Sequence, residues 1–499
     1  MGIIQKQSIK GTIYSYLGVG IGFVTTGILF PRILLTDEIG LLKILVAFSV
    51  IFAQFGSLGF NSVINRLFPY FRNVAQKHKG FIAFAFLISL SGFLLSIVAF
   101  EIYKPILIRN NYEDSSLLIE YVYLIIPLIF STLFFNLFDT YNKVLYDTVL
   151  GTFLKEFLQR FLILSSLLLY YFNLIDIHAF VIAYVISFFI PTLIIFIVLI
   201  LRGEISFNIK KEAFTKALMR EMFIISLFGI ISGLGGLAIV HIDSLMVNKF
   251  LGLSMTGIYT ITFFFGTLIL IPSRPLIKIS TPIIAESWKS NNLDNIKLVY
   301  SKSVINQSVI GILIFIGLWV NINNVFEILP EEYMAGKYVI LFIGLANVIE
   351  MAAGISGIVI GTSKYYRFSA IFIFFFLFFL IGLNYIFIPL YGLAGAALAT
   401  TLSKLLYTSL RFVFLRIRYK MQPYNYKFLV LVAIGFLSYY LGYLLPEFEN
   451  FIIDILIRSS AVVIIFSVLI LMFKVSEDIN IIYLSVINKI KSLLKFKIS

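Results

Sequence analysis

The chain contains no cysteine and only three histidines among its 499 residues. The absence of cysteine excludes disulfides, thiol chemistry and metal sites with cysteine ligands. The histidines, His78, His178 and His241, are far apart in the sequence and form no His-rich metal-binding motif. We therefore expect neither a metal ion nor another cofactor.

Charged residues are also scarce. They make up 13% of the chain, whereas a typical soluble protein has roughly a quarter. Hydrophobic residues make up 60%, and the mean hydropathy is +1.01. This composition is typical of an integral membrane protein surrounded by lipid. The formal net charge of +14 does not indicate a nucleic-acid partner, because Lys and Arg concentrate in the cytoplasmic loops of membrane proteins.

Apolar runs of membrane-spanning length recur along the whole chain. A transmembrane helix needs about 20 largely apolar residues, and about fourteen runs meet this requirement. The predicted spans are 12–35, 39–60, 80–101, 117–139, 149–171, 177–201, 222–248, 255–279, 302–322, 337–361, 367–388, 391–413, 427–445 and 451–473. The sequence therefore predicts an all-α polytopic protein.

The charges of the loops alternate along the chain. Basic residues gather after the second, sixth, eighth and twelfth predicted spans, as in the run from Arg66 to Lys79. The intervening loops carry acidic residues, such as Asp37 and Glu38 between the first two spans. The positive-inside rule then predicts that both termini lie in the cytoplasm.

Two short segments of the chain share one pattern. Arg32, Leu34 and Gly40 recur at matched spacing as Lys249, Leu251 and Gly257. An internal repeat in an apolar chain is typical of transporters built from two homologous bundles with a site between them. We call residues 32–41 and 249–258 the two copies of the signature.

The repeat and the charge pattern together predict five parts. These are an N-terminal six-helix lobe (1–201), a cytoplasmic amphipathic linker (202–221), a C-terminal six-helix lobe (222–420), two extra transmembrane helices (421–475) and an amphipathic basic cytoplasmic tail (476–499). The linker and the tail combine apolar residues with Lys and Arg. We expect both to form amphipathic helices on the anionic inner leaflet.

No motif for enzymatic chemistry is evident. The external loops are short, and no soluble domain is present to hold a donor and an acceptor. Residues 357–364 contain glycines and a lysine but lack the spacing of a phosphate-binding loop. We expect a protein that is not an enzyme and that is driven by an ion gradient, by its substrate's own gradient or by a partner.

Several charged residues fall within or near the predicted spans, where each costs about 2.5–3.5 kcal/mol at mid-bilayer. Such residues tend to face a cavity or a partner, although snorkelling to the interface is the alternative. The candidate substrate-binding cations are Arg32, Lys249, Arg274 and Lys278, of which the last two lie among prolines. Cations outnumber acids, and this favours an anionic substrate such as a pyrophosphate-linked lipid.

Three acidic residues in the spans are candidates for ion coupling: Asp139, Asp243 and Glu350. Asp243 follows His241 in the first helix of the second half, where it could bind a proton or a cation. The alternative for each is an intramembrane ion pair without a role in transport.

A late segment carries a more specific pattern. In residues 383–397, Asn384 is followed by Pro389-x-Tyr391-Gly392-x-x-Gly395 and two alanines. Pro389 and Gly392 predict a tight external turn, and Gly395 begins a face of small residues suited to close helix packing. The segment resembles the signature between two late helices of polysaccharide flippases. These belong to the multidrug/oligosaccharidyl-lipid/polysaccharide (MOP) exporter superfamily.

Other parts of the chain are similar to the same family, including the opening with Pro31, Arg32 and Gly40 and the segment from Asp243 to Tyr259. The resemblance, strongest to Wzx-type O-antigen flippases, implies two pseudo-symmetric six-helix lobes around a central cavity, plus a C-terminal helix pair. It also implies alternating access by a flippase in the bacterial cytoplasmic (inner) membrane. The implied substrate is an undecaprenyl-pyrophosphate-linked oligosaccharide for O-antigen, capsule or exopolysaccharide synthesis, and the implied partners are a polysaccharide polymerase and chain-length machinery.

Two other functions are compatible with the sequence. An ion-coupled multidrug or cation antiporter of the same superfamily would require buried carboxylates and aromatic residues in its cavity. A membrane-embedded glycan polymerase would require a large external loop with paired carboxylates. The basic bias of the spans argues against the antiporter, and the short loops argue against the polymerase.

Overall fold

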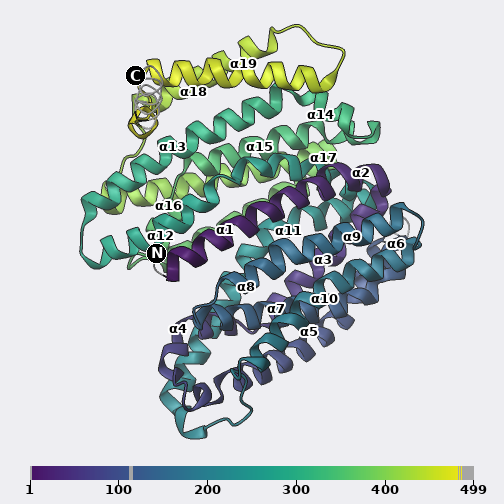
Figure 1. Ribbon diagram of the computed structural model, residues 1–499, viewed down its shortest axis with the longest axis vertical. Coiled ribbons are helices and arrows are strands. Elements are labelled where there is room, and N and C mark those ends of the chain that lie inside the picture. Colours follow the sequence, from purple (N-terminus) through teal and green to yellow (C-terminus); the bar gives the residue numbers. More distant parts are fainter. Residues whose placement is uncertain (1–2, 112–115, 482, 484, 486–499) are drawn as a thin grey trace, which may run out of the picture. The chain divides into compact units, whose positions relative to one another are not determined.

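The computed structural model describes residues 3–111, 116–481, 483 and 485, which form helices and no strand (Figure 1). Helices are expected here, because a backbone in lipid must satisfy its hydrogen bonds within the segment. The chain divides into two compact units, Met1–Ile261 and Thr262–Ser499. We call these the N-terminal unit and the C-terminal unit and describe each by itself.

The N-terminal unit is built around α7. This helix contacts α3, α4, α5 and α10, and its Phe134, Phe138 and Tyr141 side chains are buried among them. The helices of this unit are α1 (Ile3–Gly22), α2 (Phe30–Ile33), α3 (Thr36–Gly56), α4 (Phe60–Phe71), α5 (Phe81–Asn111), α6 (Ser116–Tyr121), α7 (Ile125–Val144), α8 (Val149–Thr152), α9 (Gln159–Tyr171), α10 (Ile177–Leu201) and most of α11 (Lys216–Thr267). Two π-helical segments, Phe23–Leu29 and Phe153–Leu158, follow α1 and α8.

In the C-terminal unit α15 lies between α13 and α17, and the pair formed by α18 and α19 packs on α13. The apolar contact of this pair includes Ile434, Val462 and Phe466. The helices are α12 (Ser273–Lys289), α13 (Leu293–Val320), α14 (Ile322–Ile328), α15 (Lys337–Ala352), α16 (Ser356–Gly361), α17 (Arg367–Tyr419), α18 (Tyr426–Tyr443) and α19 (Phe451–Met472).

Two glycines interrupt the longest helical runs. Gly252 in α11 has φ of 81°, and Gly392 in α17 has φ of 58°. Side chains rarely adopt positive φ, so glycine is the residue that permits these breaks. α11 and α17 therefore each contain two helices. The sequence predicts separate spans on either side of Gly252 and of Gly392.

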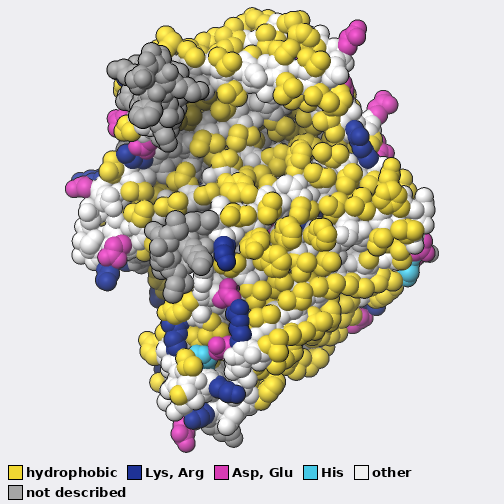
Figure 2. Space-filling view, in the orientation of Figure 1, with side chains coloured by type: hydrophobic (Ala, Val, Ile, Leu, Met, Phe, Trp, Pro, Cys, Tyr) yellow, Lys and Arg dark blue, Asp and Glu magenta, His cyan; other side chains and the backbone are white. Residues whose placement is uncertain are grey.

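Eleven helical stretches within the described residues are long and apolar enough to cross a membrane. One of them, Arg367–Tyr419, contains the break at Gly392 and covers two predicted spans. The predicted span 149–171 is not among the eleven, because it holds three charged residues, Lys155, Glu156 and Arg160, close together. The protein is thus an all-α, multi-pass membrane protein, while the count of fourteen stays a prediction. Figure 2 shows that hydrophobic side chains cover most of the visible helical surface, as contact with lipid requires.

The linker differs from its prediction. Before α11 begins at Lys216, only Lys211–Ala213 forms a helical turn. Residues 204–210 are irregular, and the Lys210 N–H donates to the Lys79 carbonyl at 3.2 Å, so this stretch is not the expected amphipathic helix. Tertiary contacts with the 72–80 loop hold it in this form. Most of the predicted tail, 476–499, lies outside the described residues.

Candidate functional site

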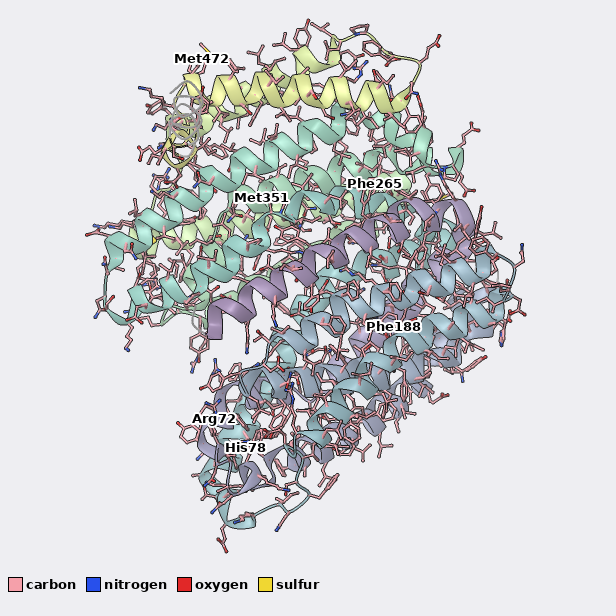
Figure 3. All side chains as sticks on the ribbon, viewed as in Figure 1. Arg72, His78, Phe188, Phe265, Met351 and Met472 are labelled. Carbon is pink, nitrogen blue, oxygen red and sulfur yellow. The ribbon has the colours of Figure 1, made fainter. Side chains whose placement is uncertain are left out.

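A polar cavity of about 640 Å³ lies within the N-terminal unit. Six helices line it, α3, α4, α7, α9, α10 and α11, and the π-helical segment Phe153–Leu158 adds Lys155. Its lining residues are Val46, Val50, Gln54, Asn61, Ser131, Thr132, Phe135, Asn136, Asp139, Thr140, Lys143, Lys155, Gln159, Phe188, Pro191, Gly233 and His241. Figure 3 labels Phe188, which lies among the helices of this unit.

One face of α7 supplies most of the polar lining. Thr132, Asn136, Asp139 and Lys143 follow one another at spacings of three and four residues, and Thr140 lies four residues after Asn136, so all five lie on the same side of the helix. The opposite faces of α7 bury aromatic and aliphatic side chains in the core of the unit. The helix is thereby fixed by its apolar faces and presents its polar face to the cavity.

The charges in the cavity are two lysines and one aspartate. Lys143 Nζ lies 2.5 Å from Asp139 Oδ2 in an ion pair one helical turn apart. Lys155 Nζ lies 5.5 Å from the centre of the Phe135 ring, and its charge interacts with that of Asp139. The Lys155 side chain is exposed although these groups surround it, because it points into the cavity. With His241 neutral, the lining carries one net positive charge.

The two carboxylate oxygens of Asp139 differ in their hydrogen bonding. Its Oδ1 is buried and has no hydrogen-bond partner among the described residues. Gly151 is in close contact with this atom, since a Cβ added there would lie 1.7 Å from Oδ1. An unsatisfied buried acceptor costs free energy, so a ligand or an ion that supplies a partner would be favoured here.

A second polar group contains the candidate Asp243. Asp243 is 2% exposed and accepts a hydrogen bond from Tyr259 Oη at 3.2 Å. Lys43 on α3 interacts electrostatically with Asp243 and with His241, which lines the cavity. The structure thus places this sequence candidate against a lysine of another helix.

The two copies of the signature meet inside the N-terminal unit. Thr36 Oγ1 and Ser254 Oγ are 2.8 Å apart. A Cβ on Gly40 would lie 2.1 Å from the Leu253 carbonyl oxygen, and one on Gly257 would lie 1.9 Å from that of Thr36. The glycines of the repeat therefore allow α3 and the second part of α11 to touch backbone to backbone. We call this the signature contact.

Arg32 and Lys249 precede the signature contact in their two copies. Both side chains are exposed, and Lys249 Nζ lies 5.5 Å from the ring of its neighbour Phe250. Neither residue lines the cavity described above. The other two cationic candidates, Arg274 and Lys278, are exposed residues of α12 in the C-terminal unit.

Glu350 is held in an ion pair. Arg411 Nη2 of α17 donates to both of its carboxylate oxygens, at 2.9 and 3.0 Å. Asn347, one turn before Glu350, accepts a hydrogen bond from Lys404 Nζ at 2.6 Å. Glu350 therefore lies in a network of its own in the C-terminal unit.

The motif near residue 390 lies at the break in α17. Pro389 directly precedes this break, and Gly392 has the positive φ that reverses the chain. Gly395 packs closely, because a Cβ there would lie 1.9 Å from the Phe387 carbonyl oxygen. These positions shape a helix-to-helix turn and carry no group that could bind a charged ligand.

Polar contacts tie the loops at one end of the N-terminal unit, where Figure 3 labels Arg72 and His78. His78 Nε2 lies 3.1 Å from Glu204 Oε2, and Arg202 Nη1 lies 2.9 Å from Asp147 Oδ2. Burial would raise the pKa of Asp147, but hydrogen bonds from Arg202 and from two backbone amides hold this pKa below its usual value. These pairs fix the end of α7 against the end of α10.

Sequence reasoning did not select several of the lining residues. Lys143, Lys155 and the amides of Gln54, Asn61, Asn136 and Gln159 were absent from the candidates. A signal for them exists, because the polar residues of 132–143 repeat at helical spacing inside an apolar span. A search for charged residues alone does not detect the uncharged amides beside them. Arg411 was missed because its partner Glu350 is 61 residues away.

Comparison with known proteins agrees with this architecture. The family model described as polysaccharide biosynthesis protein matches residues 7–288, more than half of the chain. No curated protein sequence matches the chain.

Solved structures share the fold at low sequence identity. The lipid II flippase MurJ, in an inward closed conformation, is 15% identical with a TM-score of 0.70; the match covers 94% of this chain and 98% of that one. A multidrug resistance transporter of the MATE family, inward-facing, is 16% identical with a TM-score of 0.62, covering 84% and 98%. The MATE transporter VcmN of Vibrio cholerae is 12% identical with a TM-score of 0.56, covering 84% and 99%.

The solved structures that share this fold are those of a flippase and of multidrug transporters. The chain belongs to the polysaccharide biosynthesis protein family, and its fold is the one found in these MOP superfamily structures.

Proposed function

We propose that this protein is a flippase for an undecaprenyl-pyrophosphate-linked oligosaccharide. It would carry the repeat unit of an O-antigen, capsule or exopolysaccharide from the inner to the outer face of the bacterial cytoplasmic membrane. The observation that carries the proposal is the polar cavity inside a membrane-embedded unit of a chain from this family.

The lining of the cavity suits a sugar. Its amides and hydroxyls, from residues such as Gln54, Asn61 and Asn136, can donate and accept hydrogen bonds with sugar hydroxyls. Phe135 and Phe188 offer aromatic faces to the apolar faces of sugar rings. The net positive charge disfavours the hydrophobic cations that a multidrug antiporter would carry, and so supports the flippase over that alternative.

The pyrophosphate needs cationic partners, and guanidinium and ammonium groups meet phosphate well. Arg32, Lys249, Arg274 and Lys278 remain our candidates because all four are exposed cations. Among the carboxylates, Asp139 is the best placed for ion coupling, since the residue lines the cavity and its buried Oδ1 has no hydrogen-bond partner in the described part of the chain. Asp243 and Glu350 already have protein partners.

Alternating access requires an element that closes one side and then opens. The signature contact fits this role, because it joins the two halves of the sequence repeat through glycine backbones and one pair of hydroxyls. Its acidic neighbours Asp37 and Glu38 lie in the first turn of α3, at the end of this helix that the charge pattern predicts on the outer face. In this scheme the contact closes the outer side, both termini lie in the cytoplasm, and the released unit passes to a polymerase and chain-length machinery.

The proposal is tested by the pool of lipid-linked glycans in cells deleted for this gene. We expect undecaprenyl-linked repeat units to accumulate on the cytoplasmic face while surface polysaccharide is lost. Complementation with the intact gene should restore both. An unchanged pool with increased sensitivity to cationic dyes would favour the antiporter, and unpolymerised units on the outer face would reopen the polymerase alternative.

A further inference from the structure

The C-terminal unit contains an ionic network between α15 and α17. Glu350 receives both of its hydrogen bonds from Arg411, and Lys404 donates to Asn347. The Asn347 amide in turn donates to the Gly266 carbonyl at 2.9 Å. Asn347 and Glu350 are one turn apart on α15, while Lys404 and Arg411 are two turns apart on α17, so each pair projects from one face of its helix.

The charges of this network do not balance. Lys404 and Arg411 both act on the single carboxylate of Glu350, so the charges of these three residues sum to one positive charge. The other titratable groups that face Arg411 are the hydroxyls of Tyr300, Tyr407 and Tyr424. Charges within a membrane protein are costly and tend to mark a binding or transport site.

The guanidinium of Arg411 packs against an aromatic ring, and one of its N–H donors has no hydrogen-bond partner in the described residues. Its Cζ lies 4.3 Å from the centre of the Tyr407 ring, and a Cβ on Gly357 would lie 3.0 Å from its Nη1. Its Nε is buried and has no hydrogen-bond partner within the described part of the chain. The hydroxyls of Tyr300 and Ser356 are likewise buried and unpartnered there. Buried hydrogen-bond donors without a partner cost free energy, and a ligand that accepts hydrogen bonds from them would be stabilised here.

The two partners of the ion pair differ in exposure. The side chain of Arg411 is 6% exposed and that of Glu350 is 30% exposed. The cation is therefore the fixed member of the pair, and the carboxylate is the member that solvent or a ligand can reach. A more highly charged anion could take the place of Glu350 without moving Arg411.

We propose that Arg411 and Lys404 form a receptor for phosphate oxygens, and that Glu350 is its resident counter-anion, which a pyrophosphate group displaces. The planar guanidinium suits paired phosphate oxygens, and the unused Nε–H supplies a further donor. Asn347 holds the Lys404 ammonium beside it. The inference rests on the proposed function for the source of the pyrophosphate, and it assigns an anion site to residues that the sequence did not select.

Binding to the full-length protein in nanodiscs of neutral lipid tests this receptor. The probes are undecaprenyl pyrophosphate and inorganic pyrophosphate, measured by native mass spectrometry. Glu350→Gln should tighten binding of the lipid about tenfold, because the competing charge is removed while the shape is kept. Arg411→Lys should weaken it about tenfold, since Lys cannot make the paired hydrogen bonds. Lys297→Gln, an exposed residue of α13, is the control and should change nothing.

The gain expected for Glu350→Gln separates a receptor from a structural ion pair, because misfolding cannot tighten binding. The double variant Glu350→Gln/Arg411→Gln removes both charges together and should bind weakly. The proposal is overturned if Glu350→Gln leaves the affinity unchanged or lowers it. If inorganic pyrophosphate binds as tightly as the lipid with the same pattern of variants, the receptor stands and its ligand is the free anion. The glycan pool of the deletion strain, measured independently, decides the flippase function itself.

Discussion

Substitution of Gly257 by alanine should weaken the signature contact. The added Cβ would lie 1.9 Å from the Thr36 carbonyl oxygen, 2.7 Å from the carbonyl carbon and 3.1 Å from the Cα. All three atoms belong to backbone, so no side chain can rotate away. Ordinary contact begins near 3.4 Å, and α3 must therefore separate from the second part of α11 by about 1.5 Å.

Such a shift would also break the hydrogen bond between Thr36 and Ser254, whose oxygens are 2.8 Å apart. Overpacking costs about 1–3 kcal/mol, and a lost hydrogen bond costs about 1 kcal/mol. Together these give about 2–4 kcal/mol, or roughly 30- to 1,000-fold in the ratio of open to closed molecules. The variant should favour the state in which the contact is open.

The chain has no cysteine, so a single Ser254→Cys reports on this contact. We expect a membrane-impermeant maleimide to label this cysteine faster from outside the cell when Gly257→Ala is also present. Gly20→Ala, at a position with open space around the glycine, is the matched control. The cysteine at position 254 should be labelled at the same rate with this control substitution as in the Ser254→Cys protein alone. Equal labelling rates in all three proteins, or full transport after a Thr36→Cys/Ser254→Cys disulfide has formed, would refute the reasoning.

Three other predictions concern the cavity and the C-terminal segment. Lys155→Ala should lower transport about 10- to 100-fold, because a charge-assisted hydrogen bond to the substrate is worth about 1.5–3 kcal/mol. The control Lys104→Ala, outside the cavity, should leave transport unchanged. Equal losses of transport in the two variants would remove Lys155 from the site. Gly151→Ala should lower both the melting temperature and transport, because its Cβ would lie 1.7 Å from Asp139 Oδ1. Gly20→Ala, which has open space around the glycine, is the control, and equal melting temperatures of the two variants would contradict this prediction. Hydrogen bonds from Lys302 and Asn306 hold the pKa of Asp478 below its usual value although burial opposes them, so the contact is stable above about pH 4 and is lost as the pH falls through the lowered pKa. The protection factor for hydrogen exchange at residues 476–481 should therefore stay high from pH 8 to 5 and fall in more acidic buffer, whereas Asp478→Asn should have a lower protection factor throughout; a wild-type profile in the variant would be inconsistent with this clamp.

Much of the fold follows from features that are local in the sequence. Apolar runs of spanning length and positive-φ glycines such as Gly392 are properties of single segments, and the structure contains the corresponding helices and breaks. The span predicted at 149–171 differs from the others, because it holds Lys155, Glu156 and Arg160, and Lys155 lines the cavity from a π-helical segment. Hydropathy reports how apolar a segment is and does not report how its backbone is wound.

The site depended on long-range packing and was only partly predictable. Asp139 was selected as a charge in a span, and it lines the cavity. Its partners from α3, α9 and α10 are distant in the sequence, so no local pattern unites them. The signature copies were recognised as a repeat, but their contact through Gly40 and Gly257 emerged only from the packing of α3 against α11. The four candidate cations, Arg32, Lys249, Arg274 and Lys278, are exposed, and their role depends on contacts with the substrate rather than on contacts within the chain.

The most direct test of the central claim is transport by the purified protein in proteoliposomes. The substrate is the lipid-linked oligosaccharide that accumulates in the deletion strain, placed in the inner leaflet. Our account predicts that the oligosaccharide becomes accessible to an external glycosidase at a rate that depends on the protein and falls with Lys155→Ala. If the glycan stays protected with intact protein present, while a cationic dye is transported by the same vesicles, the flippase assignment is wrong.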